Sequence, residues 1–136
     1  MAANAIVARF ADGRIVKGMS LDVAPERPTC HVRTSDGEMV EISLRDLKAL
    51  FFVKSLDGDS QKSDAQVVDA GDPRLRGAKL IEVVFHDQER IVGMVMRFPP
   101  LKTYFFLVPA DPTSNNLRIL VNRDQVKEMG VITSSA

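Results

Sequence analysis

The sequence predicts an all-β protein built from two tandem five-stranded small β-barrels. Three observations support this fold class. A nine-residue motif occurs twice, short apolar segments are separated by tight turns, and the pattern of a single 3₁₀ turn precedes the expected last strand of each barrel. Short strands at close, regular spacing are typical of all-β barrels and sandwiches.

The repeated motif spans residues 10–18 and 85–93. Both copies fit Phe-x-Asp-x-x-x-(Val/Ile)-x-Gly, with an offset of 75 residues (85 − 10). Solenoid repeats usually recur every ~20–50 residues, so this longer period indicates a duplicated small domain. We therefore expect a first barrel at 5–54, a linker rich in Ser, Asp and Gly at 55–77, and a second barrel at 78–132.

The first half has the pattern of consecutive hairpins. Asp12-Gly13 predicts a type I′ turn, and Asp36-Gly37 predicts another tight turn. In the motif itself, we expect Phe10 to point inward and Gly18 to permit a bend or bulge in the second strand. The four strands expected around these turns lie at 6–10, 15–21, 29–34 and 38–43.

The first half ends with a change of pattern. A polar pair lies between Leu44 and Leu47, which fits one 3₁₀ turn, and the apolar segment 48–53 predicts a fifth, largely buried strand. Five strands with a 3₁₀ turn before the last is an order similar to that of Src-homology-3-like and Sm-like small barrels.

The second half repeats the same elements. Its turn, Asp87-Gln88-Glu89, lacks the glycine of the first copy, so a looser hairpin is expected. Ile42 and Val121 are 79 residues apart (121 − 42), so the second copy gains four residues (79 − 75), most simply in the loop 109–116. The expected strands lie at 79–86, 90–98, 103–108 and 117–121, with a last strand after Val126.

The composition argues against several classes of protein. Eighteen basic residues balance eighteen acidic ones along both halves, unlike the basic composition of a dedicated nucleic-acid-binding domain. No apolar run approaches the ~18 residues of a membrane span, and the N-terminus does not have the pattern of a signal peptide. A single cysteine permits no internal disulfide. We expect a cytoplasmic protein with no membrane contact.

No constellation of residues predicts catalysis, a metal site or a cofactor. Cys30 and His31 are adjacent on an expected strand, so their side chains should point to opposite faces. The chain lacks a second cysteine for a zinc site. His86 beside Asp87 has the pattern of a surface histidine next to a turn-forming aspartate. The expectation is a protein that is not an enzyme.

The best candidate for a binding site is the polar loop before the expected strand 117–121. Its side chains can hydrogen-bond a ligand, or they can fold the loop on its own Asx turns. The candidate binding residues are Asp111, Ser114, Asn115, Asn116 and Arg118.

Aromatic residues provide a second candidate surface. Phe51-Phe52 and Tyr104-Phe105-Phe106 place adjacent rings on opposite faces of a strand. The outer rings either pack between the two halves or form a partner surface that includes Pro99, Pro100 and Tyr104.

Four segments carry a family resemblance that covers nearly the whole chain apart from the linker. They are residues 10–18, 44–54, 106–112 and 115–118. They resemble a bacterial tandem-repeat domain of unknown function that is found beside PilZ or response-regulator domains. The resemblance implies a signalling context and no established activity.

These observations predict a non-catalytic interaction or regulatory module that binds a protein, or associates with itself, in bacterial signalling. One alternative is an Sm-like RNA-binding protein, which would bring cationic side chains together on one face. Another is a small-ligand-binding module that uses the loop 111–116. The cationic residues of the RNA hypothesis are Arg9, Arg14, Lys17, Arg33, Arg118 and Arg123.

Overall fold

The computed structural model describes residues 3–56 and 73–132. Ten antiparallel strands form one sheet in the order β10-β6-β7-β8-β9-β5-β1-β2-β3-β4. The first half contains β1 (Asn4–Phe10), β2 (Ile15–Ser20), β3 (Thr29–Arg33), β4 (Met39–Ser43), the 3₁₀ turn η1 (Leu44–Asp46) and β5 (Leu47–Val53). The second half contains η2 (Pro73–Leu75), β6 (Lys79–Phe85), β7 (Arg90–Val95), β8 (Tyr104–Pro109), β9 (Asn116–Asn122), η3 (Arg123–Gln125) and β10 (Val126–Val131).

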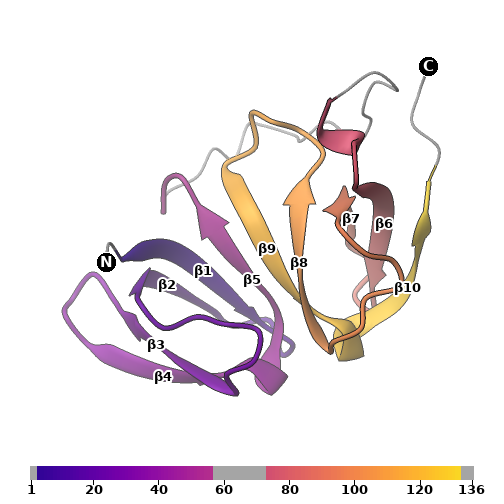
Figure 1. Cartoon of the computed structure of the whole chain (residues 1–136). Helices are drawn as coiled ribbons and strands as arrows, with labels where there is room; N and C mark the ends of the chain where they lie inside the picture. Colours follow the sequence, from indigo (N-terminus) through magenta and orange to yellow (C-terminus); the bar gives the residue numbers. More distant parts are fainter. Residues whose placement is uncertain (1–2, 57–72, 133–136) are drawn as a thin grey trace.

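The all-β fold is confirmed, but the arrangement as two separate small β-barrels is not. Each half is a series of neighbouring strands in the same order, β5-β1-β2-β3-β4 in the first and β10-β6-β7-β8-β9 in the second. Strand β5 also pairs with β9, so the halves join edge to edge into one open sheet (Figure 1). The join gives partners to backbone groups that would otherwise lie unpaired at two strand edges.

The predicted division into 5–54, 55–77 and 78–132 stays a prediction. Most of the expected linker lies outside the described residues, which resume at Pro73 with η2. The expected strand 90–98 ends earlier, at Val95.

The two largest hydrophobic cores lie on opposite faces of the sheet, and β5 contributes to both. Phe52 belongs to the core of the first half and Phe51 to that of the second, and every residue of β5 is buried. Since successive side chains of a strand point to opposite faces, a continuously apolar strand requires cover on both sides. The rings of Phe52 and Phe106 meet edge to face at 6.0 Å, which confirms aromatic packing between the halves.

Two polar side chains also connect the halves at this junction. The Lys48 ammonium lies 2.7 Å from a carboxylate oxygen of Asp87, forms a second ion pair with Glu89, and contacts the face of the Phe85 ring. The side-chain amide of buried Asn122 donates a hydrogen bond to the Leu47 carbonyl at 2.8 Å. Because Asp87 and Glu89 belong to the β6–β7 turn, Lys48 attaches that turn to the first half.

Backbone hydrogen bonds recur at equivalent positions of the two halves. The Ala11 amide donates to the Asp46 carbonyl at 2.9 Å, and the His86 amide donates to the Gln125 carbonyl at 3.0 Å. These positions are separated by the sequence offsets of 75 (86 − 11) and 79 (125 − 46). The β2–β3 pair Met19–Arg33 likewise corresponds to the β7–β8 pair Met94–Val108.

The β1–β2 hairpin has a different turn from the type I′ turn predicted. The Gly13 amide donates to the Phe10 carbonyl at 3.0 Å, and the Phe10 amide donates to the Arg14 carbonyl at 2.8 Å. This is a three-residue loop, in which a type I turn is followed by a left-handed residue. Gly13 has a φ of 97°, whereas a type I′ turn would also require a positive φ at Asp12, which the structure does not have.

The β6–β7 hairpin closes with the same two hydrogen bonds, so the looser turn predicted there is wrong. The Gln88 amide donates to the Phe85 carbonyl and the Phe85 amide to the Glu89 carbonyl, both at 2.9 Å. Gln88 takes the left-handed position of Gly13 with a φ of 76°. The Asp87 carboxylate accepts from the Glu89 amide at 3.0 Å and so supports the turn without a glycine.

Gly18 and Gly93 are required by close approach of the next strand, and not by a bulge. A Cβ on Gly18 would collide with the Arg33 carbonyl, and one on Gly93 would collide with the Val108 carbonyl. The β1–β2 and β6–β7 pairs run through these glycines without a register shift. Phe10 and Phe85 point inward as predicted.

Replacing either of these glycines with alanine should destabilise the fold. Gly18→Ala and Gly93→Ala are each expected to lower the free energy of unfolding by ~1–3 kcal/mol, because the new methyl group overlaps backbone atoms. Urea denaturation measures the change. Gly130→Ala in β10 is the control, since nothing lies within 4 Å of its would-be Cβ; a loss equal to that of the other two variants would contradict this explanation.

Gln88→Gly should stabilise the protein. The left-handed conformation costs a residue with a side chain ~1–2 kcal/mol, and part of that gain is offset because glycine has more freedom in the unfolded chain. We expect a net gain of about 0.5–1 kcal/mol by urea denaturation. Gly13→Gln should produce a loss at the corresponding turn. A destabilised Gln88→Gly variant would show that the glutamine side chain has a structural role of its own.

Candidate functional site

The predicted binding loop folds largely on its own side chains. The Asp111 carboxylate accepts hydrogen bonds from the Thr113 amide at 2.8 Å and from the Thr113 hydroxyl at 2.7 Å. The Ser114 hydroxyl accepts from the Asn116 amide at 3.0 Å, and Ser114 is buried. These are the Asx-type contacts expected of a loop that folds on its own Asx turns, the alternative to a ligand-binding loop.

Asn115 fastens the loop to the end of β5. Its side-chain oxygen accepts from the Ser55 amide at 3.1 Å, its side-chain nitrogen donates to the Ser55 carbonyl at 2.9 Å, and its backbone carbonyl accepts from the Lys54 amide at 2.8 Å. Both polar atoms of the side chain are therefore used in joining the halves.

A hollow of about 230 Å³ lies beside this loop. Of the predicted binding residues, Asp111 and Asn116 line it, together with the cationic side chains of Lys54 and Arg74. Arg74 donates hydrogen bonds to the carbonyls of Pro109 and Ala110. Its remaining lining residues are Val108, Pro109, Pro112 and Leu117.

Arg118 is not part of that hollow. Its guanidinium lies 4.2 Å from the centre of the Phe52 ring and 4.4 Å from that of Phe106. It therefore covers the aromatic contact between the halves on the face of the first core. Of the predicted partner surface, Pro99 is exposed and Tyr104 half-buried, whereas Pro100 is buried and adds no exposed area.

The adjacent Cys30 and His31 point to opposite faces of β3, as predicted. Cys30 is fully buried, and burial together with the charge of Asp22 raises the pKa of its thiol to about 11. A thiol with such a high pKa is a poor nucleophile at neutral pH. Among residues 3–56 and 73–132, no group of three or more His, Cys, Asp and Glu side chains is arranged to hold a metal ion.

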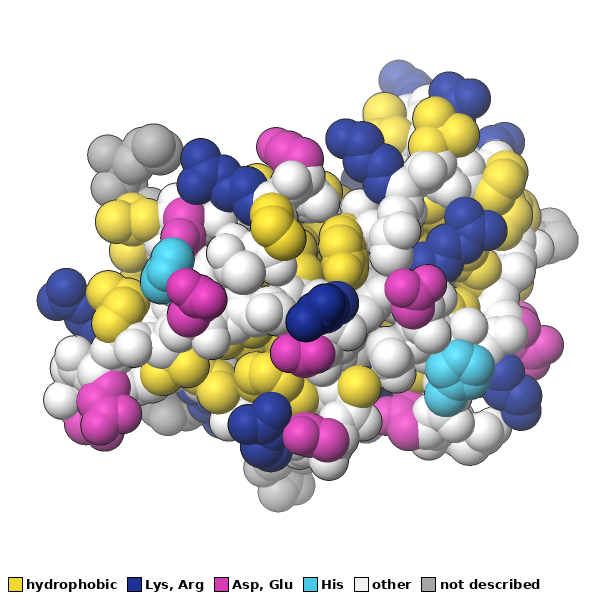
Figure 2. All heavy atoms as spheres, turned by 90° about the horizontal axis from the view of Figure 1, so that it is seen from below, with side chains coloured by type: hydrophobic (Ala, Val, Ile, Leu, Met, Phe, Trp, Pro, Cys, Tyr) yellow, Lys and Arg dark blue, Asp and Glu magenta, His cyan; other side chains and the backbone are white. Residues whose placement is uncertain are grey.

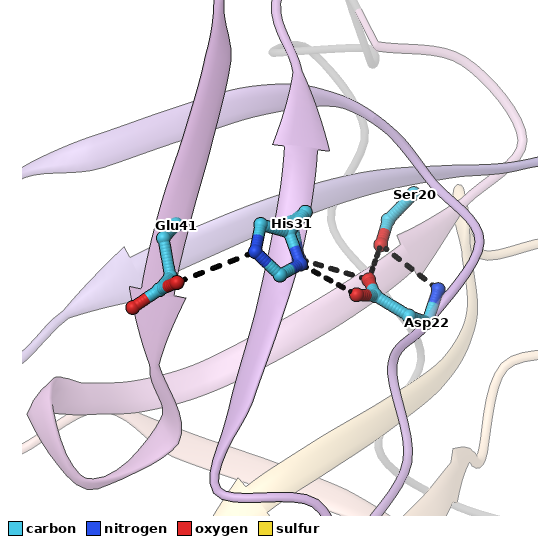
Figure 3. A network of polar contacts seen from close by, with 4 residues as sticks. All are labelled: Ser20, Asp22, His31 and Glu41. Carbon is cyan, nitrogen blue, oxygen red and sulfur yellow. Dashed lines mark hydrogen bonds and ion pairs between the residues drawn. The ribbon is translucent and has the colours of Figure 1, made fainter.

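His31 is the centre of a polar cluster that connects three segments of the first half (Figure 3). Its Nδ1 lies 2.7 Å from an Asp22 carboxylate oxygen, and its backbone amide donates to the other oxygen at 2.8 Å. Its Nε2 lies 3.3 Å from the Glu41 carboxylate on β4. The Ser20 hydroxyl donates to Asp22 at 3.1 Å. The cluster joins the loop after β2 to β3 and β4.

The charges in this cluster stabilise one another. The hydrogen bond and the charge of Asp22 raise the pKa of His31, and Glu41 acts in the same direction. Partial burial alone would raise the pKa of Asp22, but hydrogen bonds from His31 and Ser20 outweigh burial and lower it. Because Ser20 donates to Asp22 and not to the imidazole, His31 is not placed to take a proton from that hydroxyl. The cluster can therefore hold charge, but it lacks the contacts of a nucleophilic site.

The cluster lies beside the open edge of the sheet at β4, which pairs with β3 on one side and with no described strand on the other (Figure 1). The Thr34 amide donates to the Glu38 carbonyl, and the Leu44 amide donates to a carbonyl preceding β3. Because hydrogen-bonded residues alternate in an antiparallel pair, the even-numbered residues of β4 face β3. The backbone N–H and C=O groups of Met39, Glu41 and Ser43 therefore point to the open edge.

The six cationic residues of the RNA hypothesis do not lie on one face. Arg9 covers the Phe51 ring on the side of the second core, whereas Arg118 covers Phe52 on the opposite face. Arg14 is paired with Asp12. In Figure 2, Lys and Arg side chains alternate with Asp and Glu over the visible face.

Comparison with known proteins places the chain in a family. A family of unknown function, DUF6982, matches residues 2–133. The chain belongs to this family. No curated protein and no solved structure matches it. The match spans both halves of the sheet, which agrees with the resemblance to a domain of unknown function, and it assigns no activity. None of the described helices of this DUF6982 member has the length and apolarity needed to cross a membrane.

Sequence reasoning allowed for binding through an open sheet edge, but it missed the cluster and did not identify β4 as that edge. The register of the β3–β4 hairpin could have revealed part of the cluster, because a turn closed by Thr34 and Glu38 places His31 opposite Glu41. Asp22 lies in an irregular loop, and no sequence pattern relates it to β3.

The stability supplied by the His31 cluster should decrease as the pH rises. Since the folded-state pKa of His31 is raised, its contribution is fully present below the ordinary value of ~6.5 and is lost as the pH passes through the folded-state pKa. NMR titration should place the His31 midpoint above ~6.5 and show a downward shift in Asp22→Asn. An unchanged His31 midpoint in Asp22→Asn would contradict the assigned contact.

Proposed function

We propose that this protein is a non-catalytic interaction module of bacterial signalling that binds protein through the open edge of its sheet at β4. The observation that carries the proposal is the row of outward-pointing backbone groups at Met39, Glu41 and Ser43. An extended segment of another polypeptide can pair with such an edge as an additional strand.

The side chains beside this edge support the proposal. Met39 and Met19 are exposed, and both lie opposite Arg33 in the register of the sheet. Methionine side chains adapt to differently shaped apolar partners. Natural sheets usually protect a free edge with proline, a bulge or a short strand. β4 has neither a proline nor a register shift, and its protection consists of its five-residue length and one charged residue, Glu41.

The signalling context of the proposal rests on the family resemblance described above. The equivalent hydrogen bonds of the two halves support a second part of the proposal, that the chain arose by duplication of one five-stranded unit. In such a duplicate, one fourth strand is used at the junction with β5 and the other, β4, stays free.

A small-ligand site beside the loop 111–116 is the second candidate, and the hollow lined by Lys54 and Arg74 is the observation that favours it. It is less well supported than the β4 edge, because the loop uses its Asp111, Ser114 and Asn115 side chains in internal contacts. An Sm-like RNA-binding role is the least well supported, since the cationic side chains lie on opposite faces.

Proline at position 43 should abolish protein binding without unfolding the sheet. Ser43 has a φ of −89° and an outward-pointing amide, so Ser43→Pro removes a donor from the free edge and spares the β3–β4 hydrogen bonds. Immobilised wild type and variant are incubated with lysate of the source organism, with and without nuclease treatment, and bound proteins are identified by mass spectrometry. The proteins retained by wild type should be absent from the variant.

Ser43→Ala is the matched control, because it removes the same hydroxyl and keeps the amide. It should retain the bound proteins. Equal retention by Ser43→Pro would exclude the β4 edge as the binding surface, and capture that depends on intact nucleic acid would favour the RNA hypothesis instead. Circular dichroism confirms that both variants keep the sheet.

A further inference from the structure

Among the strands that the structure describes, the sheet has two free edges, and they are of complementary types. The internal junction joins β9, the fourth strand of the second half, to β5, the fifth strand of the first. The edges that remain are β4, the other fourth strand, and β10, the other fifth strand. Each copy of the chain therefore carries the two components of one further junction, at opposite ends of the sheet.

Both free strands present the backbone groups that this junction requires. The Ile132 amide donates to the Leu80 carbonyl, so the backbone groups of alternate residues of β10 point toward β6. The backbone N–H and C=O groups of Met129 and Val131 therefore point outward. The corresponding residues of β5, Leu50 and Phe52, lie opposite β9.

The register of the internal junction can be applied to the equivalent residues of the two free edges. Leu50 pairs with Leu120 and Phe52 pairs with Arg118 in the β5–β9 contact. At the offset of 79 residues, these pairs correspond to Met129 opposite Glu41 and Val131 opposite Met39. Val131 and Met39 are 55% and 56% exposed, so this pairing would cover two apolar side chains that the isolated chain leaves in water.

The ion pair at the internal junction also has equivalent residues near the two free edges, where Asp12 is paired with Arg14, the residue at the position of Glu89. Lys48 pairs with Asp87 across the halves. The equivalent residues, Lys127 at offset 79 and Asp12 at offset 75, lie in β10 and in the β1–β2 turn, and no contact between them is formed within the described chain. Lys48 and Lys127 each fall at a register shift of their strand, which gives the two lysines the same local setting. In the register of the internal junction, Lys127 of one copy would lie beside Asp12 of another.

We propose that β10 of one copy pairs with β4 of a second copy in the register of the β5–β9 junction, with Lys127 of one copy paired with Asp12 of the other. This inference rests on the proposed function and names its partner as the chain itself. The contact is heterologous, so each added copy offers a further free edge, and the assembly either closes into a ring or elongates.

The contact between copies should be weaker than the internal one. His31 and Glu41 occupy the positions of Phe106 and Leu120 (106 − 31 and 120 − 41 give the offsets 75 and 79), and Glu128 occupies that of Ala49. These substitutions replace apolar area with charge. The association should therefore depend on concentration and weaken as salt is added.

Edge-blocked variants test the inference by sedimentation of the purified full chain. Wild type should associate as its concentration rises. Ser43→Pro blocks β4 and Val131→Pro blocks β10, so each variant alone should remain a monomer. An equimolar mixture of the two should form a one-to-one complex and nothing larger, because it contains one usable β4 edge and one usable β10 edge.

Charge exchange tests the register. Lys127→Glu should weaken the association about tenfold or more, and the double variant Lys127→Glu, Asp12→Lys should recover it. Arg97→Glu makes the same charge change in the exposed loop after β7, outside both edge strands, and should associate like wild type.

Two results would overturn the inference. They are a wild type that stays monomeric at every concentration, and an association that persists in both proline variants. If wild type is monomeric while Ser43→Pro loses a different captured protein, the β4 edge binds another polypeptide and only the self-pairing is wrong. If Ser43→Pro loses nothing, the proposed function fails as well.

Discussion

The pairing of β5 with β9 is the interaction on which the rest of the structure depends. Strand β5 is apolar on both faces, and neither half alone can cover both. The first core covers Leu50 and Phe52, whereas the second covers Phe51 and Val53. Separation of the halves would expose large aromatic side chains and leave the Lys48 ammonium without Asp87 and Glu89. The junction therefore couples two small units, each too small to bury a large core alone, into one stable sheet.

The two halves share their strand order but use corresponding parts differently. In the second half, the β6–β7 turn of the motif contacts Lys48, and the fourth strand, β9, pairs with β5 at the junction. Asn115, in the longer loop before β9, binds that half to the first. In the first half, the corresponding turn is closed by a local ion pair between Asp12 and Arg14, and the fourth strand is free. Loops usually carry function because they tolerate insertions. Here the longer loop serves the junction, and the free edge of β4 is the better candidate for interaction.

The His31 cluster shows how a free edge can be kept soluble and still available. Positions that are apolar in the second half, Phe106 and Leu120, are charged in the first and neutralise each other across β3 and β4. Such a pair keeps water at the edge and makes pairing with a further strand sensitive to charge. A partner of β4 must therefore match both the backbone of an edge strand and the charges beside it.

The sequence by itself determined the all-β class, the positions of the strands, the 3₁₀ turns and the inward direction of Phe10 and Phe85. Those features follow from alternation, turn residues and strand length, which act over a few neighbouring residues. It did not determine how the strands are shared, because the contacts of Lys48 with Asp87 and of Asn115 with Ser55 join residues far apart along the chain. The left-handed conformation of Gln88 and the close approaches at Gly18 and Gly93 could not be predicted from the sequence for a related reason. Their conformations are set by the strand or side chain packed against them, which only the tertiary structure decides.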